Sequence, residues 1–227
     1  MFFKYKIKNN DKLNQEKLNK VLNMAKRLLE NSTETNVRDH PIYGLIKVLI
    51  NYQLYDLARN LCEGENVISI AKIYEDLGIW VDGFNTDDCI NDDVEKMVEL
   101  EIDLSTDIVL MCAWNEGRFA NALVNIGANV ENPFNFDKNN HFVSYIYPLG
   151  ITLVDNGNHS LLTGVLKSEG VVYPIQTYDI TGHYELVYFD GTYYREKNTD
   201  KIIHKVERFE LGAVFEIGRL LAEKGIK

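Results

Sequence analysis

Residues 151–170 constrain the fold of this chain more than any other stretch. They begin ITLVDNGNHS and continue as an apolar segment that ends at Gly170. This pattern predicts a buried strand over residues 151–155, a tight turn at Asn156-Gly157, and a helix over residues 159–170. A strand that runs directly into a helix leaves the first N–H groups of the helix free at one point. Such a point is typical of an anion or phosphate site.

Strands on both sides of this segment place the turn within a sheet. Residues 142–147 and 171–178 read as strands, and residues 148–150 read as a hairpin connection between neighbouring strands. Residues 151–178 therefore predict a β-α-β unit with parallel strands, which puts the turn at the carboxyl end of a strand, where ligands collect in α/β sheets. Gly157 can adopt a positive φ and let the backbone approach a ligand closely.

Helical periodicity dominates the first half of the chain, and the second half is mixed. Asn115 is the expected N-cap of one helix and Gly127 its left-handed stop. An Asp190-Gly191 turn predicts a hairpin over residues 184–195. Apolar spacing predicts further helices over residues 18–29, 42–61, 67–77, 115–127 and 207–224.

The expected fold class is therefore α+β with an α/β core. Residues 1–110 form a helical region and residues 111–227 a mixed-sheet region packed against it. No internal repeat or long linker separates the two regions, so we expect one compact unit.

Composition excludes several classes of protein. We expect no signal peptide, because residues 1–8 lack a long apolar core, and the 227 residues contain no run of the length of a membrane span. Three separated cysteines, Cys62, Cys89 and Cys112, favour reduced thiols and a cytoplasmic location. A net charge of −10 without a basic patch disfavours direct DNA binding. Nothing in the composition decides the oligomeric state.

The acidity is concentrated in residues 82–107, which carry ten acidic side chains against the single Lys96. Their spacing does not match a twelve-residue EF-hand loop, so a solvated acidic face is favoured over a calcium site. A short helix is expected near residues 93–101. This stretch also supports an alternative function, in which the chain is a non-catalytic interaction module that docks a basic partner.

The polar triplet after Gly157 supplies the first candidate site residues. His159 is the candidate catalytic residue, because an imidazole can carry a proton or donate to a phosphate. Asn158 and Ser160 are candidate phosphate ligands, although both residue types also serve simply as helix caps. No zinc-binding spacing of histidine and cysteine occurs, so no metal site is expected.

Other candidates come from neighbouring elements. Arg118 stands in the first turn of a helix, where a cation is unfavourable unless an anion accompanies it, and Asn115 precedes it. Either a ligand or a salt bridge to the acidic stretch provides that anion. His141 begins the strand that pairs with residues 151–155, and the hairpin register decides whether it reaches the triplet. His183 and His204 are expected at the surface, and Cys112 as a buried inert thiol.

These motifs carry a resemblance. Gly157-Asn158-His159-Ser160, between a strand and a helix, resembles the G-x-H-R box of the ParB/sulfiredoxin-like superfamily, which holds nucleotide phosphates at a helix N-terminus. Together with Trp114-Asn115-x-x-Arg118 and Asn139-Asn140-His141, the box is similar to that of an uncharacterised bacterial domain family of unknown function. The resemblance covers about residues 110–180.

The resemblance implies a phosphate-bearing ligand, most simply a nucleotide, with hydrolase or phosphotransfer activity as a further expectation. Mg²⁺ is a plausible helper, with Asp155 the nearest candidate ligand. The chain departs from its best-known relatives in two places, because Asn158 replaces the sulfiredoxin cysteine and Ser160 replaces the usual arginine. Sulfinic-acid reduction and centromere-type DNA binding are therefore not expected. A nuclease function is disfavoured, because the sequence has no cluster of carboxylates near the turn.

Overall fold

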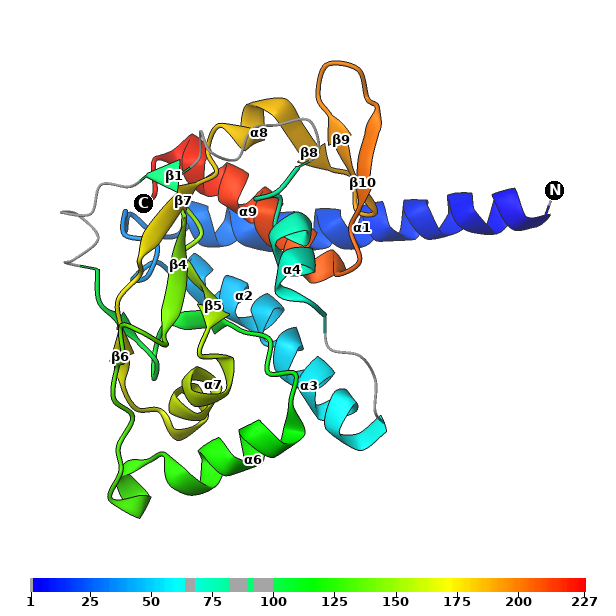
Figure 1. Cartoon of the computed structure of the whole chain (residues 1–227). Helices are drawn as coiled ribbons and strands as arrows, with labels where there is room; N and C mark the ends of the chain where they lie inside the picture. The colour runs from blue at the N-terminus through cyan, green and yellow to red at the C-terminus, as the bar shows by residue number, and fades with distance from the viewer. Residues whose placement is uncertain (1, 64–67, 82–89, 92–99) are drawn as a thin grey trace.

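A computed structural model describes residues 2–63, 68–81, 90–91 and 100–227 of the chain. It is a mixed α/β structure, which confirms the expected broad class. A five-stranded sheet lies at its centre, with helices against both faces (Figure 1). The expected boundary at residue 110 falls at the end of a strand of this sheet.

The central sheet has the order β1-β7-β4-β5-β3 and is mixed in direction. β4 pairs antiparallel with β5 and parallel with β7, while β3 pairs parallel with β5. The hairpin of β4 and β5 matches the sequence prediction. The strands are β1 (Ile90–Asn91), β3 (Ile108–Leu110), β4 (Phe142–Tyr147), β5 (Ile151–Asn156) and β7 (Gln176–Asp179).

The predicted parallel β-α-β unit is wrong. The expected strand over residues 171–178 is broken at Pro174, whose nitrogen has no hydrogen to donate to a ladder. Its first part, β6 (Val171–Val172), pairs with β2 (Ile102–Asp103) in a separate sheet. Its second part, β7, lies beside β4 and so runs opposite to β5. The turn at Gly157 nevertheless follows the carboxyl end of β5.

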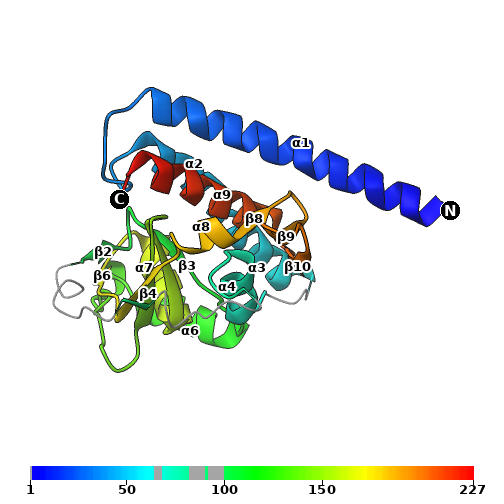
Figure 2. The same cartoon turned by 90° about the horizontal axis from the view of Figure 1, so that it is seen from above.

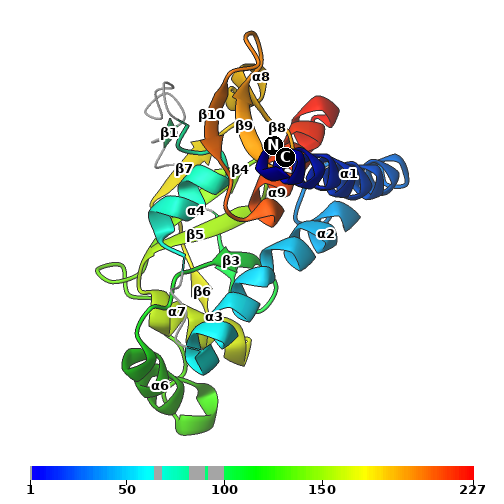
Figure 3. The same ribbon diagram turned by 90° about the vertical axis from the view of Figure 1, so that its right-hand side faces the viewer.

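Alternation along the strands divides the core between the two faces of the sheet. Ile151 and Leu153 face the larger cluster, which includes residues of the first, second, fourth and last helices. Val154 faces a second cluster with Leu161 and Leu162 of α7 (Asn158–Lys167). Figures 2 and 3 show α1, α2 and α9 grouped together, with α7 apart from them.

The N-terminal region is helical, as expected. α1 (Phe2–Glu30) is longer than its apolar pattern and projects beyond the rest of the chain in Figure 1. The predicted helix over residues 42–61 is wrong as one element, because it breaks at Asn51 into α2 (Pro41–Ile50) and α3 (Tyr52–Glu63). α2 packs into the core, whereas α3 buries no residue completely. The two helices therefore pack against different parts of the chain. α4 is Ile70–Asp76, capped by Ser69.

Side chains complete the hydrogen bonds of β3, which is the last strand in the order of the central sheet. The Gln53 amide donates to the Val109 carbonyl at 2.9 Å and accepts from the Met111 N–H at 3.0 Å. The Tyr43 hydroxyl accepts from the Ile108 N–H at 2.8 Å. α3 therefore supplies to this edge the donor and acceptor that a neighbouring strand would supply.

After α6 (Glu116–Asn125), the chain does not turn at Gly127 in the predicted left-handed way. Ile126 ends the helix in extended conformation, and Gly127 has φ 141° and ψ 149°. The Gly127 N–H instead donates to the Asn132 carbonyl at 2.7 Å. A short 3-10 helix η2 (Ala128–Val130) follows.

The C-terminal hairpin forms with a helical turn before it. The expected strand over residues 184–189 begins as α8 (His183–Leu186) and only then continues as β8. His183 is buried at 4% exposure and His204 is partly buried, so the expected surface positions are wrong for both. The remaining elements are β8 (Val187–Phe189), β9 (Tyr193–Glu196), β10 (Ile202–Lys205) and α9 (Phe209–Lys224).

A buried carboxylate joins α4 to the start of α9. Asp76 is fully buried, and its oxygens accept from the main-chain N–H groups of Glu207 at 3.1 Å and Arg208 at 2.8 Å. The His204 ring lies 3.3 Å from the same carboxylate, and the Lys72 ammonium lies 3.7 Å away. Asp76 thus satisfies N–H groups at the beginning of a buried helix.

Among the described residues, no helix is both long enough and apolar enough to cross a membrane.

Candidate functional site

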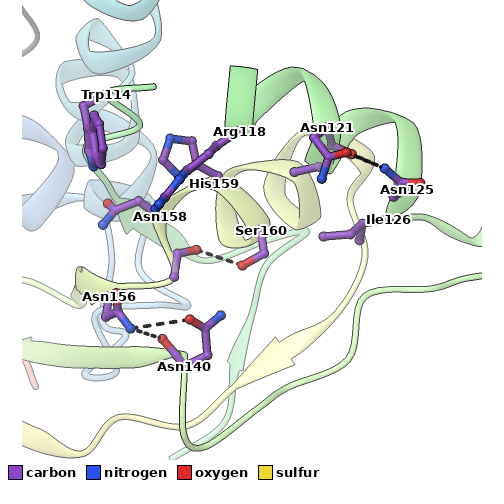
Figure 4. Close-up of a pocket in the computed structure, with 12 residues that line it drawn as sticks. Trp114, Arg118, Asn121, Asn125, Ile126, Asn140, Asn156, Asn158, His159 and Ser160 are labelled. Carbon is purple, nitrogen blue, oxygen red and sulfur yellow. Dashed lines mark hydrogen bonds between the residues drawn. The ribbon is translucent and has the colours of Figure 1, made fainter. Parts of the chain in front are cut away.

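The strand directions bring three chain segments to one edge of the sheet. β3 and β5 are parallel, so their carboxyl ends meet, and β4 is antiparallel, so its first residues lie there too. A cavity of about 270 Å³ opens at this edge between α6 and α7 (Figure 4). Its described lining contains one arginine, one histidine and no carboxylate. Five asparagines also line it: Asn121, Asn125, Asn140, Asn156 and Asn158.

Gly157 is the residue that connects β5 to α7. Its φ of 87° and ψ of 17° are left-handed, as the sequence predicts. A Cβ at this position would lie 2.6 Å from Cδ2 of His141 and 3.1 Å from the Asn140 carbonyl oxygen, so no side chain fits. No described side chain caps α7. The N–H groups of its first turn therefore remain available at the cavity.

Asn158 holds the end of β3 in place. Its Oδ1 accepts from the Cys112 N–H at 2.6 Å. Neither Asn158 nor Ser160 caps α7, so the simple capping role that their residue types favour is not the one observed. Cys112 itself is buried, and burial raises the pKa of its thiol to about 12. The predicted burial of this thiol is confirmed.

His159 faces the cavity with one ring nitrogen already engaged. The Asn115 N–H donates to Nε2 at 3.2 Å, and the ring meets Trp114 edge-on with centroids 5.9 Å apart. A nitrogen that accepts carries no proton, so Nδ1 carries the proton of the neutral ring. Burial, and then the positive charge of Arg118, lower the pKa of His159 below its usual value. His159 is therefore a neutral donor at pH 7.

A pH dependence follows from this neutral ring. The folded pKa of His159 lies below the unfolded value of 6.5, so the unfolded chain takes up the proton first as the pH falls. The stability contribution is present above 6.5 and is lost as the pH falls through the folded pKa. Urea unfolding between pH 7.5 and 5.0 should show a steeper loss for wild type than for His159→Gln, whose side chain does not titrate. Parallel curves would contradict this assignment.

His141 does reach the turn, because Phe142 pairs with Asn156 in the hairpin. It is buried behind Gly157 and is not part of the cavity lining. Its Nδ1 accepts from the Asp137 N–H at 3.0 Å, and its Nε2 lies 2.9 Å from Oγ of Ser160. The Ser160 hydroxyl donates in turn to the Gly157 carbonyl at 3.0 Å.

These hydrogen bonds indicate that His141 stabilises the turn and does not contact a ligand in the cavity. Since Nδ1 of His141 accepts, Nε2 carries the proton and donates to Ser160. Burial lowers the pKa of His141, which agrees with a neutral ring. Ser160 reaches the cavity, whereas His141 fixes the turn from behind.

Arg118 is the one charged side chain in the described lining of the cavity. Asn115 is the N-cap of α6, as predicted, and its Oδ1 accepts from the Arg118 N–H at 2.8 Å. The guanidinium lies 5.5 Å from the ring centre of Trp114, a side chain that is 62% exposed. Within the described residues Arg118 forms no ion pair. In Figure 4 it extends from α6 toward the start of α7.

The carboxylates singled out in the sequence, Asp155 and those of the acidic stretch, do not line the cavity in the described part of the chain. Asp155 is not part of the described lining: it lies on the opposite face of β5 and accepts from Tyr74 at 2.7 Å and Ser144 at 2.6 Å. The described chain contains no group of three potential metal ligands. Most of the acidic stretch, including residues 93–99 of the helix expected near residues 93–101, lies outside the described residues, and residues 100–101 are not helical. At its end, Asp107 pairs with Arg38 at 2.5 Å.

Comparison with family models gives one match, over residues 3–227, to a family of unknown function, DUF6710. The chain belongs to the DUF6710 family. Curated proteins and solved structures give no match. The family assignment agrees with the expected domain of unknown function, and the ParB/sulfiredoxin-like arrangement stays a prediction.

In this DUF6710 chain, the cavity lining also contains Asn121 and Asn125, which belong to none of the sequence motifs. Asn121 and Asn125 follow Arg118 by three and seven positions, so all three side chains share one face of α6. The Asn125 amide donates to Oδ1 of Asn121 at 2.9 Å. Asn140 and Asn156 face each other across the β4–β5 hairpin. In the sequence, the helical spacing of Arg118, Asn121 and Asn125 within the predicted helix over residues 115–127 was the signal that could have identified this polar face.

Proposed function

We propose that this chain binds a small phosphate-bearing molecule, most simply a nucleotide, in the cavity between α6 and α7. The observation that carries the proposal is the charge of the lining, where Arg118 has no described ion-pair partner and no carboxylate is present. The uncapped start of α7 adds N–H donors and the positive end of a helix dipole at the same place. The similarity to a ParB/sulfiredoxin-like box supports the same ligand class.

The proposal gives each group a role. N–H groups at the start of α7, at residues 158–160, hold phosphate oxygens, and the Arg118 guanidinium neutralises their charge. His159 donates from Nδ1, because Nε2 is engaged by Asn115. Ser160 contributes its main-chain N–H, because its hydroxyl already donates to the Gly157 carbonyl. Gly157 permits the close approach that these contacts require.

A reaction is a further step of the proposal. His159 is the group that would move a proton in a hydrolase or phosphotransferase, since a neutral imidazole both donates and accepts a proton. The described lining offers no carboxylate to hold Mg²⁺, and Asp155 is engaged elsewhere, so we assign no Mg²⁺ site. We also propose a cytoplasmic location, on the basis of the three separated cysteines.

The Arg118→Gln variant tests the proposal. Glutamine keeps a polar side chain, although a shorter one, and removes the charge, so affinity for phosphate compounds should fall about tenfold or more. Isothermal calorimetry with inorganic phosphate, AMP and ATP measures this change. Arg27→Gln on α1, another exposed arginine, should bind like wild type. If no compound gives heat with wild type, or if Arg118→Gln binds equally well, the proposal fails.

A further inference from the structure

We infer that the cavity selects a ligand with one phosphate group on a hydroxyl-bearing remainder, the chemistry shared by sugar phosphates and nucleoside monophosphates. This inference rests on the phosphate binding proposed above and restricts it. The restriction comes from the number of charges, the asparagine amides and the volume of the cavity.

The charges at the cavity suit a single phosphate group. Arg118 supplies one positive charge, and the start of α7 adds about half a charge. A phosphate monoester carries about −1.5 to −2 at pH 7, which these groups balance. Lys167 is not free to help, because it donates to the main-chain oxygens of Leu123 at 2.8 Å and of Ile126. A triphosphate would bring three phosphate groups to one arginine.

The asparagines suit a neutral remainder. They form two pairs, in which Asn125 donates to Asn121 at 2.9 Å and Asn156 donates to the Asn140 carbonyl at 2.8 Å. Each amide has more donors and acceptors than these bonds use, since an amide offers two hydrogens and an oxygen with two lone pairs. Neutral donors and acceptors on α6 and at the β4–β5 hairpin match hydroxyl groups, which both give and accept hydrogen bonds.

The volume and the other lining residues fit a compact molecule. The cavity measures about 270 Å³, and sites for drug-sized ligands span roughly 300–1,000 Å³. Ala122 and Ile126 add a small apolar surface to the lining. Arg118 precedes Asn121 and Asn125 on the same helix face, so phosphate near Arg118 directs the remainder toward the amides.

Calorimetry with four probes tests the inference: inorganic phosphate, ribose 5-phosphate, AMP, and ATP with and without MgCl₂. Ribose 5-phosphate or AMP should bind about tenfold more tightly than inorganic phosphate, and ATP no more tightly than AMP. A preference for AMP over ribose 5-phosphate would identify a nucleotide, and equal binding a sugar phosphate. Asn121→Ala should weaken the organic phosphates severalfold and leave inorganic phosphate unchanged, while Asn19→Ala on α1 should change neither.

Two results would overturn the inference and leave phosphate binding intact. One is tighter binding of ATP with MgCl₂ than of AMP. The other is equal affinity for inorganic phosphate and both organic phosphates, with no effect of Asn121→Ala. The absence of binding by all four probes would instead remove the proposed function itself, so the two failures are distinguishable.

Discussion

Replacing Gly157 by alanine is expected to lower the free energy of unfolding by about 2 kcal/mol or more. Two effects add. The left-handed φ of 87° is unfavourable for a residue with a Cβ, and that Cβ would lie 2.6 Å from the His141 ring. Moving the ring breaks its bond to Ser160 at the cavity. Urea denaturation measures the loss, and AMP calorimetry should show weakened binding as well.

Gly44→Ala is the matched control. Gly44 lies within α2, and a Cβ there would meet no atom within 4 Å. Alanine is a better helix former than glycine by about 1 kcal/mol, so this variant should be as stable as wild type or more stable. Similar stability of the Gly157 and Gly44 variants would show that the turn tolerates a side chain, against the geometry described for it.

Removing the Asp76 carboxylate is expected to have the largest effect on stability, a loss of about 3 kcal/mol in the Asp76→Ala variant. The substitution removes a fully buried carboxylate and leaves the N–H groups of Glu207 and Arg208, just before α9, without their acceptor. It also removes the carboxylate beside His204 and Lys72. Thermal and urea unfolding measure the loss. Asp76→Asn keeps one acceptor oxygen and should lose less.

Glu75→Ala is the control for this position. Glu75 precedes Asp76 and pairs with Lys72 at 2.9 Å, but its side chain is 41% exposed. An exposed ion pair contributes little, so the cost should stay below about 1 kcal/mol. Equal losses at positions 75 and 76 would mean that burial of the carboxylate does not determine its contribution.

Local sequence signals predicted the elements that form the candidate site. The β4–β5 hairpin, the glycine turn, the Asn115 cap and α7 depend on residues close in sequence, and each lies within a few residues of its predicted place. Arg118 and His159 were separate candidates in the sequence, and they meet because β3 and β5 pair in parallel, a pairing that the sequence did not predict. His141 depended on register, which the length of the hairpin connection decides.

Long-range packing determined what the sequence did not predict. The place of β7 beside β4 rather than β5 depends on sheet assembly, and Pro174 was the local sign that one strand would become two. The break at Asn51 lies within a continuous apolar periodicity, so no local rule places it. Asp155 lies near the end of β5, where a metal ligand would be expected. The alternation of side chains along the strand, however, directs it to the face of the sheet opposite the cavity.

The amide of Gln53 affects whether a second molecule can pair with the sheet through β3. An open strand edge is a template on which a second chain can align and polymerise. At β3 that template is already filled, since one glutamine occupies the carbonyl of Val109 and the N–H of Met111. An incoming strand would have to displace α3 before it could align. At this edge, the number of strands in the sheet is thus limited by a helix side chain.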